Sequence, residues 1–178
     1  DEAPLAGEEV RDKTSERLFH SDAPFYDYPS GLIDAEARHI LIQRESQMRP
    51  PNLVLWHDGQ GRELTNIEPA VNLLTRVGKE LIRYTRSDGV ELTGTLYLPP
   101  DHDGSPLPGL LWGYPSEYKS AARAEQLRDS PYPYIHPSWG GPLFFALIGY
   151  AVLDDPSFPV VGEGEEEPND SYVKQLLD

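Results

Sequence analysis

Three runs in the first half of the chain carry the apolar and polar patterns of short β-strands. They cover residues 38–45, 52–57 and 62–65, and residues 58–61 (Asp-Gly-Gln-Gly) predict the turn before the third run. Three short antiparallel strands in succession suit a meander or one blade of a β-propeller. A single blade needs neighbours on both faces, so it does not stand alone.

The residues before these runs lack a comparable pattern. Residues 1–17 are charged and largely without apolar periodicity, which predicts a loose or partly helical lead-in. Residues 20–31 are rich in Pro, Ser, Asp and aromatic side chains, so we expect a loop anchored by its rings.

The second half begins with two alternating runs, 79–86 and 90–98, around an Asp-Gly turn, which predict a β-hairpin. Further elements are expected in this order: a short buried strand at 110–112, a buried helix at 143–148 capped by Gly149, a buried strand at 150–153, and a helix beginning near Ser171 with Asn169 or Asp170 as N-cap. Apolar strands separated by helices indicate a covered, mostly parallel sheet. We place the boundary between the two halves near residues 72–78.

Composition excludes several classes of protein. With 30 acidic and 15 basic side chains the formal net charge is -15, which argues against binding to nucleic acid or to an anionic membrane. The absence of cysteine excludes disulfides, thiolate catalysis and Cys-ligated zinc, and leaves the compartment open. No apolar run approaches the roughly 20 residues of a membrane span. The chain shows no signal peptide and both its ends look cut, so we expect a soluble piece of a longer protein.

Few residues carry a recognisable catalytic or metal-binding pattern. No serine has glycines at both Gly-x-Ser-x-Gly positions, and no two histidines stand at metal-ligand spacing. His39 and His57 are read as ordinary strand histidines, whereas His136 is either an ordinary loop histidine or part of a pocket. We therefore expect no metal, and no cofactor either, because the Gly162-x-Gly164 pair lacks the third glycine of a dinucleotide fingerprint.

The acidic run at 163–167 does not follow the ligand order of a calcium loop. A solvated acidic loop is the simpler interpretation. The alternative is that these carboxylates bind a cationic group of a substrate beside a catalytic cleft.

Tyr114 is the candidate site residue. It follows the predicted strand 110–112, and ligands of open α/β sheets bind beyond the carboxyl ends of strands. Gly113 lets the backbone pass close to its surroundings and Pro115 stiffens the chain after it. A phenol in this place can donate a hydrogen bond to an oxyanion, or simply pack its ring and bond locally.

Four stretches carry a resemblance to a known family: KELIRYTRSDGVELTGTLYLPP, PLPGLLWGYPSEYKSA, GYAVLDDPSFPVVGEGEEEPNDSYVKQLLD and, upstream, RHILIQRESQMRPPNLVLWHDGQGRELT. Together they resemble the prolyl oligopeptidase family of serine peptidases, and most closely its glutamyl endopeptidase-like branch. The resemblance implies a mixed fold, in which propeller-blade-like antiparallel strands precede the first half of an α/β-hydrolase sheet. Residues 1–76 would end the β-propeller, and residues 77–178 would begin the hydrolase domain.

The resemblance also implies a function. The full-length parent would hydrolyse peptide substrates through a Ser acyl-enzyme, and Tyr114, in the context Trp112-Gly113-Tyr114, would be its oxyanion donor. The nucleophile, Asp and His of such enzymes lie beyond this chain, so the chain alone is expected to be inactive. Two alternatives stay open: a non-catalytic remnant or binding module, and an esterase-type hydrolase on the same fold. Oligomeric state is not predicted.

Overall fold

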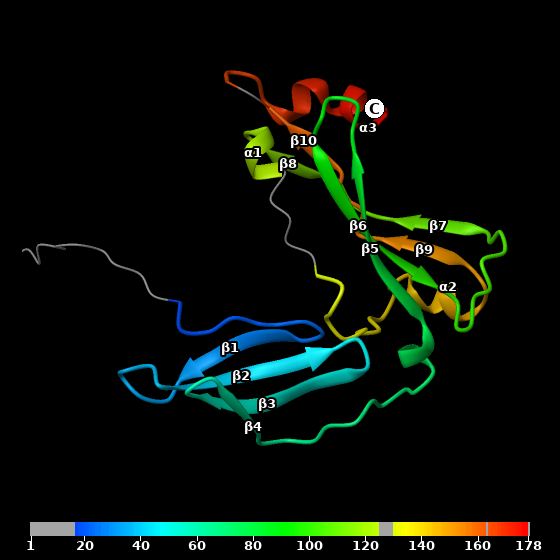
Figure 1. Ribbon diagram of the computed structural model, residues 1–178. Coiled ribbons are helices and arrows are strands. Elements are labelled where there is room, and N and C mark those ends of the chain that lie inside the picture. The colour runs from blue at the N-terminus through cyan, green and yellow to red at the C-terminus, as the bar shows by residue number, and fades with distance from the viewer. Residues whose placement is uncertain (1–16, 125–129, 163, 178) are drawn as a thin grey trace, which may run out of the picture.

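The computed structural model describes residues 17–124, 130–162 and 164–177. Figure 1 shows two strand-rich parts joined by an extended linker, with a long segment of the second part running back between them. The lead-in expected over residues 1–17 lies outside the described residues except for Arg17. None of the helices in this described part is long and apolar enough to cross a membrane.

The first part is an antiparallel sheet with the spatial order β1-β2-β3-β4. Its strands are β1 (Tyr26–Leu32), β2 (His39–Ser46), β3 (Arg49–His57) and β4 (Gln60–Glu63). Three of them confirm the predicted runs. The turn before β4 is shorter than predicted, because Asp58 and Gly59 (φ 47° and 76°) complete a two-residue hairpin turn on their own.

Strand β1 corrects the loop expected over residues 20–31. It pairs with β2 as an edge strand, and a bulge between Pro29 and Gly31 accommodates both residues that indicated a loop. An ion pair of 2.7 Å between Arg44 and Asp27 ties the strand to β2. Proline is tolerated here because the backbone N–H groups on the open side of an edge strand make no hydrogen bonds to another strand.

One face of this sheet holds its core. Ile40, Ile42 and Val54 are buried on it, and Phe19 and Trp56 pack against them with their rings edge to face at 5.1 Å. The segment before β1 therefore covers this face through Phe19, which lies just before the predicted loop.

The second part is a mixed sheet, not the mostly parallel one that was predicted. Its strands, in the spatial order β5-β6-β9-β7, are β5 (Gly78–Thr85), β6 (Glu91–Leu98), β9 (Ala151–Asp154) and β7 (Gly109–Trp112). The predicted hairpin is confirmed as β5–β6. Because β9 joins this hairpin antiparallel to β6, the pairing of β9 with β7 is parallel and the other two pairings of this sheet, among the described strands, are antiparallel.

Strand β7 and helix α2 (Leu143–Leu147) are more exposed than their apolar sequences predicted. Leu111 and Trp112 are 58% and 51% exposed, because β7 is an edge of the sheet in the described part of the chain. Helix α2 is amphipathic: Ala146 is buried, while Phe144 remains half-exposed. Gly149 follows the helix with φ 100°, which confirms its predicted place at the C-terminal cap.

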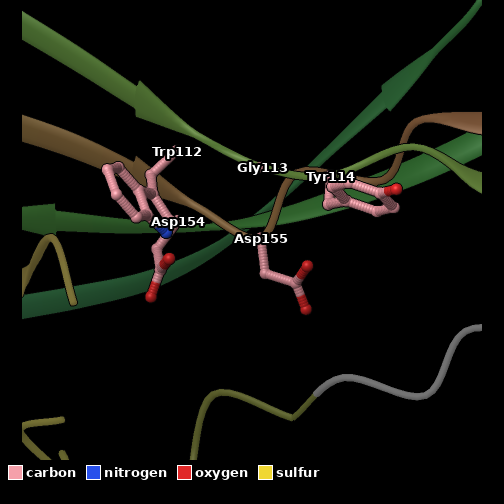
Figure 2. A pocket seen from close by; sticks show the side chains of 5 residues that line it. All are labelled: Trp112, Gly113, Tyr114, Asp154 and Asp155. Carbon is pink, nitrogen blue, oxygen red and sulfur yellow. The ribbon is translucent and has the colours of Figure 1, made fainter. Parts of the chain in front are cut away.

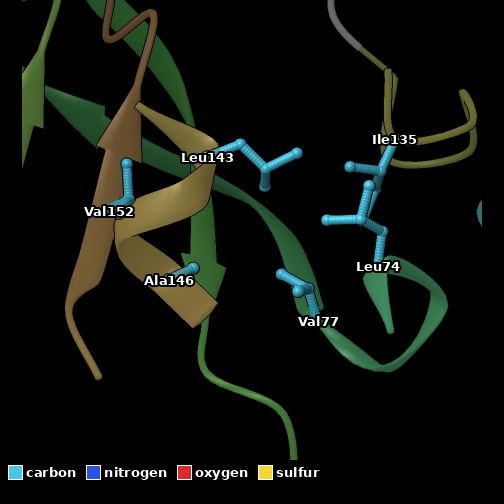
Figure 3. Packing of buried hydrophobic residues seen from close by; sticks show 6 residues of the cluster. All are labelled: Leu74, Val77, Ile135, Leu143, Ala146 and Val152. Atoms are coloured by element: carbon cyan, nitrogen blue, oxygen red, sulfur yellow. The ribbon is translucent and has the colours of Figure 1, made fainter. Parts of the chain in front are cut away.

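The core of the second part draws on residues that are distant in sequence. Its members come from the linker with its 3₁₀ turn η1 (Leu74–Arg76), from residues 130–142 before helix α2, from α2 itself and from strand β9. Figure 3 shows the buried ones: Leu74, Val77, Ile135, Leu143, Ala146 and Val152. Residues 130–142 thus contribute to the core as well as leading into α2.

A small third layer packs around the tip of the β5–β6 hairpin (Figure 1). It contains the parallel pair β8 (Ser116–Tyr118) and β10 (Pro159–Val161) and the helices α1 (Ala121–Ala124), η2 (Pro168–Ser171) and α3 (Tyr172–Leu177). The predicted final helix exists, but its N-cap was wrong. Glu167 caps η2 in a capping box with Asp170, since Pro168 supplies a helical first position with no N–H to satisfy.

Candidate functional site

The candidate site lies where the two parallel strands β7 and β9 end. Trp112 is opposite Asp154 in their register, and the Asp155 amide donates a hydrogen bond of 2.9 Å to the Trp112 carbonyl oxygen. Both strands therefore stop at the same level. Tyr114 follows β7 directly and lies at the carboxyl end of the pair, as the sequence predicted (Figure 2).

Gly113 sets the position of Tyr114. A Cβ atom built on Gly113 would lie 3.0 Å from side-chain atoms of Pro156 and Phe158, which is tighter than nine in ten such contacts, so these side chains would have to move by a few tenths of an ångström. Glycine lets the backbone pass this closely against the segment after β9 without displacing it. Tyr114, the next residue, points to solvent, with 82% of its surface exposed.

An open pocket of about 350 Å³ surrounds this point, lined by Trp112, Gly113, Tyr114, Asp154 and Asp155. Figure 2 shows Trp112 and Asp154 side by side, with Asp155 between them and Tyr114. The Tyr114 hydroxyl makes no hydrogen bond to any residue that the structure describes. It is therefore free to donate to a ligand at the end of β7.

Burial shapes the electrostatics of this pocket. It raises the pKa of the Asp154 carboxyl, and the neighbouring charge of Asp155 raises it further. Burial, with a smaller effect of Asp154, also raises the pKa of Tyr97 to about 12. The pocket thus combines an exposed phenol donor, an indole wall and two carboxylates, one of which is partly desolvated.

Sequence reasoning did not single out Asp154, Asp155 or Trp112. The signal was present, because the acidic pair ends an apolar strand that pairs with β7. Recognising it required the knowledge that β7 and β9 are neighbours, although about forty residues separate them in the chain.

The other sequence candidates lie elsewhere. His136 Nε2 is 3.1 Å from the Glu45 carboxylate on β2, so it joins the two parts of the chain and does not line the Tyr114 pocket. In the acidic run, Glu163 lies outside the described residues, while Glu167 caps η2 and pairs with Lys119. Within the described ranges, no group of three or more His, Asp or Glu side chains could hold a metal.

No protein-family model matches the chain. Among curated proteins, it is 37% identical over 183 residues to the "Probable glutamyl endopeptidase, chloroplastic" of Oryza sativa subsp. japonica, covering 95% of this chain and 20% of the relative. The protein of the same name from Arabidopsis thaliana is 38% identical over 183 residues, covering 95% and 19%. The chain spans about a fifth of the length of these relatives.

A solved structure, oligopeptidase B from Leishmania major, matches 88% of this chain and 20% of its own with a TM-score of 0.50 and 15% identity, which is a likeness of fold. The chain therefore matches one segment of longer proteins that are named as peptidases. Among these proteins, the segment is homologous to the glutamyl endopeptidase-like proteins. This confirms the resemblance to the glutamyl endopeptidase-like branch of the prolyl oligopeptidase family.

Proposed function

We propose that the chain is a segment of a serine-type peptidase in which Tyr114 donates its hydroxyl to the oxyanion formed during peptide hydrolysis. In this proposal, residues 1–76 end a β-propeller and residues 77–178 begin an α/β-hydrolase domain. The nucleophilic serine and its His and Asp partners belong to the remaining part of the protein, and the substrate is a peptide.

The hydrolase assignment is supported by the strand order around β7. Strands β7 and β9 form a parallel pair, and the far side of β7 carries no other strand among the described residues. Its N–H and C=O groups on that side can accept a further parallel strand. A nucleophile placed at the end of such a strand would lie next to Tyr114, since parallel strands end at one edge of a sheet.

The propeller assignment is supported by the two faces of the β1–β4 sheet. One face is covered by the segment before β1, as described above. The other face carries Tyr28 and Leu53, which are 63% and 36% exposed and flank Gln43 in the register of the sheet. A sheet with apolar side chains on both faces is expected to pack against neighbouring sheets.

A single observation carries the proposal: the exposed Tyr114 hydroxyl at the carboxyl end of β7, beside the open edge of the sheet. A preorganised donor in this place stabilises charge that develops on a carbonyl oxygen, and the loss of such a donor costs about 2 to 4 kcal/mol of transition-state stabilisation. Because the relatives are named glutamyl endopeptidases, peptide bonds at Glu are the first substrates to assay.

The test is the steady-state kinetics of Tyr114→Phe in the full-length protein. Without the hydroxyl, kcat should fall by about one to three orders of magnitude, whereas KM should change by less than about threefold. Tyr28→Phe, an exposed tyrosine of the first sheet, is the matched control and should leave both constants unchanged. An unchanged kcat in Tyr114→Phe would remove Tyr114 from the oxyanion hole.

A further inference from the structure

The first sheet has a polar hollow of about 350 Å³ at the end of the sheet that carries the β3–β4 turn, lined by His39, Leu55, His57, Gln60, Gly61 and Arg62. The register brings these residues together from three strands: His39 on β2 lies opposite His57 on β3, and Gln60 and Arg62 on β4 lie opposite His57 and Leu55. All of them except Gly61 project from the face that also carries Tyr28 and Leu53, and they lie beyond those two residues toward the β3–β4 turn.

One wall of the hollow is a stacked pair of imidazoles. The rings of His39 and His57 are parallel within 8°, with centroids 4.1 Å apart. The Asp34 carboxylate is 2.7 Å from His39 Nδ1 and also accepts the backbone N–H groups of Arg38 and His39, at 3.0 and 2.9 Å. These hydrogen bonds hold the pKa of Asp34 below its usual range and fix the orientation of the His39 ring, so that Nε2 is left on the side away from Asp34.

Arg62 supplies a positive charge to the lining of the hollow. Its guanidinium makes no hydrogen bond or ion pair with any residue in the described part of the chain. The carboxylates of the surrounding loops and strands have partners already, as the following pairs show: Asp34 with His39, Glu36 with Arg38, Asp58 with His57, and Glu63 with Arg49. Although acidic side chains outnumber basic ones two to one in the chain, Arg62 is left without a counter-charge among the described residues and is available to an external anion.

We propose that this hollow is a binding site for a carboxylate group carried on a short aliphatic stem. The Arg62 guanidinium matches the two oxygens of a planar carboxylate, and the Gln60 amide offers a further donor. Leu55 and the stacked imidazole rings offer apolar surface for the stem. A single guanidinium, with Asp34 and Asp58 nearby, suits one negative charge better than the two of a phosphate.

The test is ligand-observed saturation-transfer NMR on the full-length protein, with N-acetylglutamate α-amide as the probe and the glutamine α-amide as its neutral counterpart. We expect saturable binding of the glutamate probe only, weakened at least about fivefold in Arg62→Gln. Arg83→Gln, an exposed arginine of β5, is the matched control and should bind like the wild type. Tyr114→Phe should also leave the binding unchanged, which separates this site from the proposed catalytic one.

The carboxylate can come from a separate peptide or from an acidic side chain of the longer protein itself. In the second case the probe does not bind, and Arg62→Gln lowers Tm while Arg83→Gln does not. Equal binding of the charged and neutral probes overturns the proposal, as does binding that is unaffected by Arg62→Gln. Absence of binding together with an unchanged Tm in Arg62→Gln overturns it as well.

Discussion

At the scale of single residues, the candidate site depends on what surrounds Tyr114. The sequence predicted Tyr114 correctly as the residue after a strand and Gly113 as the residue that lets the chain pass closely. It could not show that the close contact is with Pro156 and Phe158, because that requires β7 and β9 to be paired.

Gly113→Ala tests this contact. The added methyl group would meet Pro156 and Phe158 at 3.0 Å, so we expect the free energy of unfolding to fall by about 1 to 3 kcal/mol. Denaturant unfolding of the variant measures the change. Gly109→Ala, at the start of β7, is the matched control, since nothing lies within 4 Å of its added methyl group, and its stability should stay within about 0.5 kcal/mol of the wild type.

Asp154→Asn tests the electrostatics of the same pocket. Because burial raises the pKa of Asp154, the folded protein binds its proton more tightly than the unfolded chain does. Stability therefore falls as the pH rises from the usual pKa of aspartate through the raised one, and stays lower above that window.

We expect Asp154→Asn to raise the free energy of unfolding at pH 7 by less than about 1 kcal/mol. The gain in stability should disappear below about pH 3.5, where the wild-type Asp154 side chain is protonated and therefore as neutral as the asparagine of the variant. Denaturant unfolding of both proteins across this pH range is the measurement. A loss of stability at pH 7 would show that the carboxylate is stabilised by a partner.

At the scale of elements, local sequence signals were sufficient to predict elements formed by neighbouring residues. Pairings between strands that are distant in the sequence could not be predicted. The β5–β6 hairpin was predicted because an Asp-Gly turn between alternating runs is contained in a few residues. Strands β8 and β10 were missed because each has only three residues and pairs with a distant partner. The same limit explains the wrong expectation of a mostly parallel sheet.

Helix α3 is attached to its neighbours by side chains rather than by apolar packing. Gln175 accepts a hydrogen bond of 2.9 Å from the Val161 amide and donates one of 2.8 Å to the Val161 carbonyl oxygen. The buried Arg86 guanidinium at the hairpin donates to the same Gln175 oxygen at 3.1 Å. One amide therefore links the helix, strand β10 and the hairpin.

Gln175→Leu tests this link. It would leave the Val161 backbone groups and one Arg86 donor without partners, so we expect a loss of about 1 to 3 kcal/mol in the free energy of unfolding. The exposed neighbour Lys174→Gln is the control and should change stability by less than about 0.5 kcal/mol. Equal stability of the two variants in denaturant unfolding would contradict the role of Gln175.

At the scale of the whole molecule, the segment 130–136 ties the two parts together. Ile135 is buried in the core of the second part, while the neighbouring His136 contacts Glu45 of the first. The Gln47 side chain, just after β2, donates to the backbone oxygens of Pro131 and Lys79 at 2.7 and 3.3 Å. These contacts could not be predicted from the sequence, because the partners of this segment lie in another sheet.

Gln47→Ala should loosen this junction. Removing the amide takes away both hydrogen bonds, and we expect the free energy of unfolding to fall by about 1 to 2 kcal/mol. Gln43→Ala, an exposed glutamine within β2, is the control and should have little effect. If the two variants unfold alike in denaturant, the junction does not depend on Gln47.

The most direct test of the central claim is a crystal structure of the full-length protein with a phosphonate bound covalently to its nucleophile. A phosphonyl oxygen in such an adduct stands for the oxyanion of peptide hydrolysis. The account predicts that the Tyr114 hydroxyl lies about 2.7 to 3.1 Å from that oxygen and donates a hydrogen bond to it. An adduct whose phosphonyl oxygen is bound by other donors, with Tyr114 facing solvent, would contradict it.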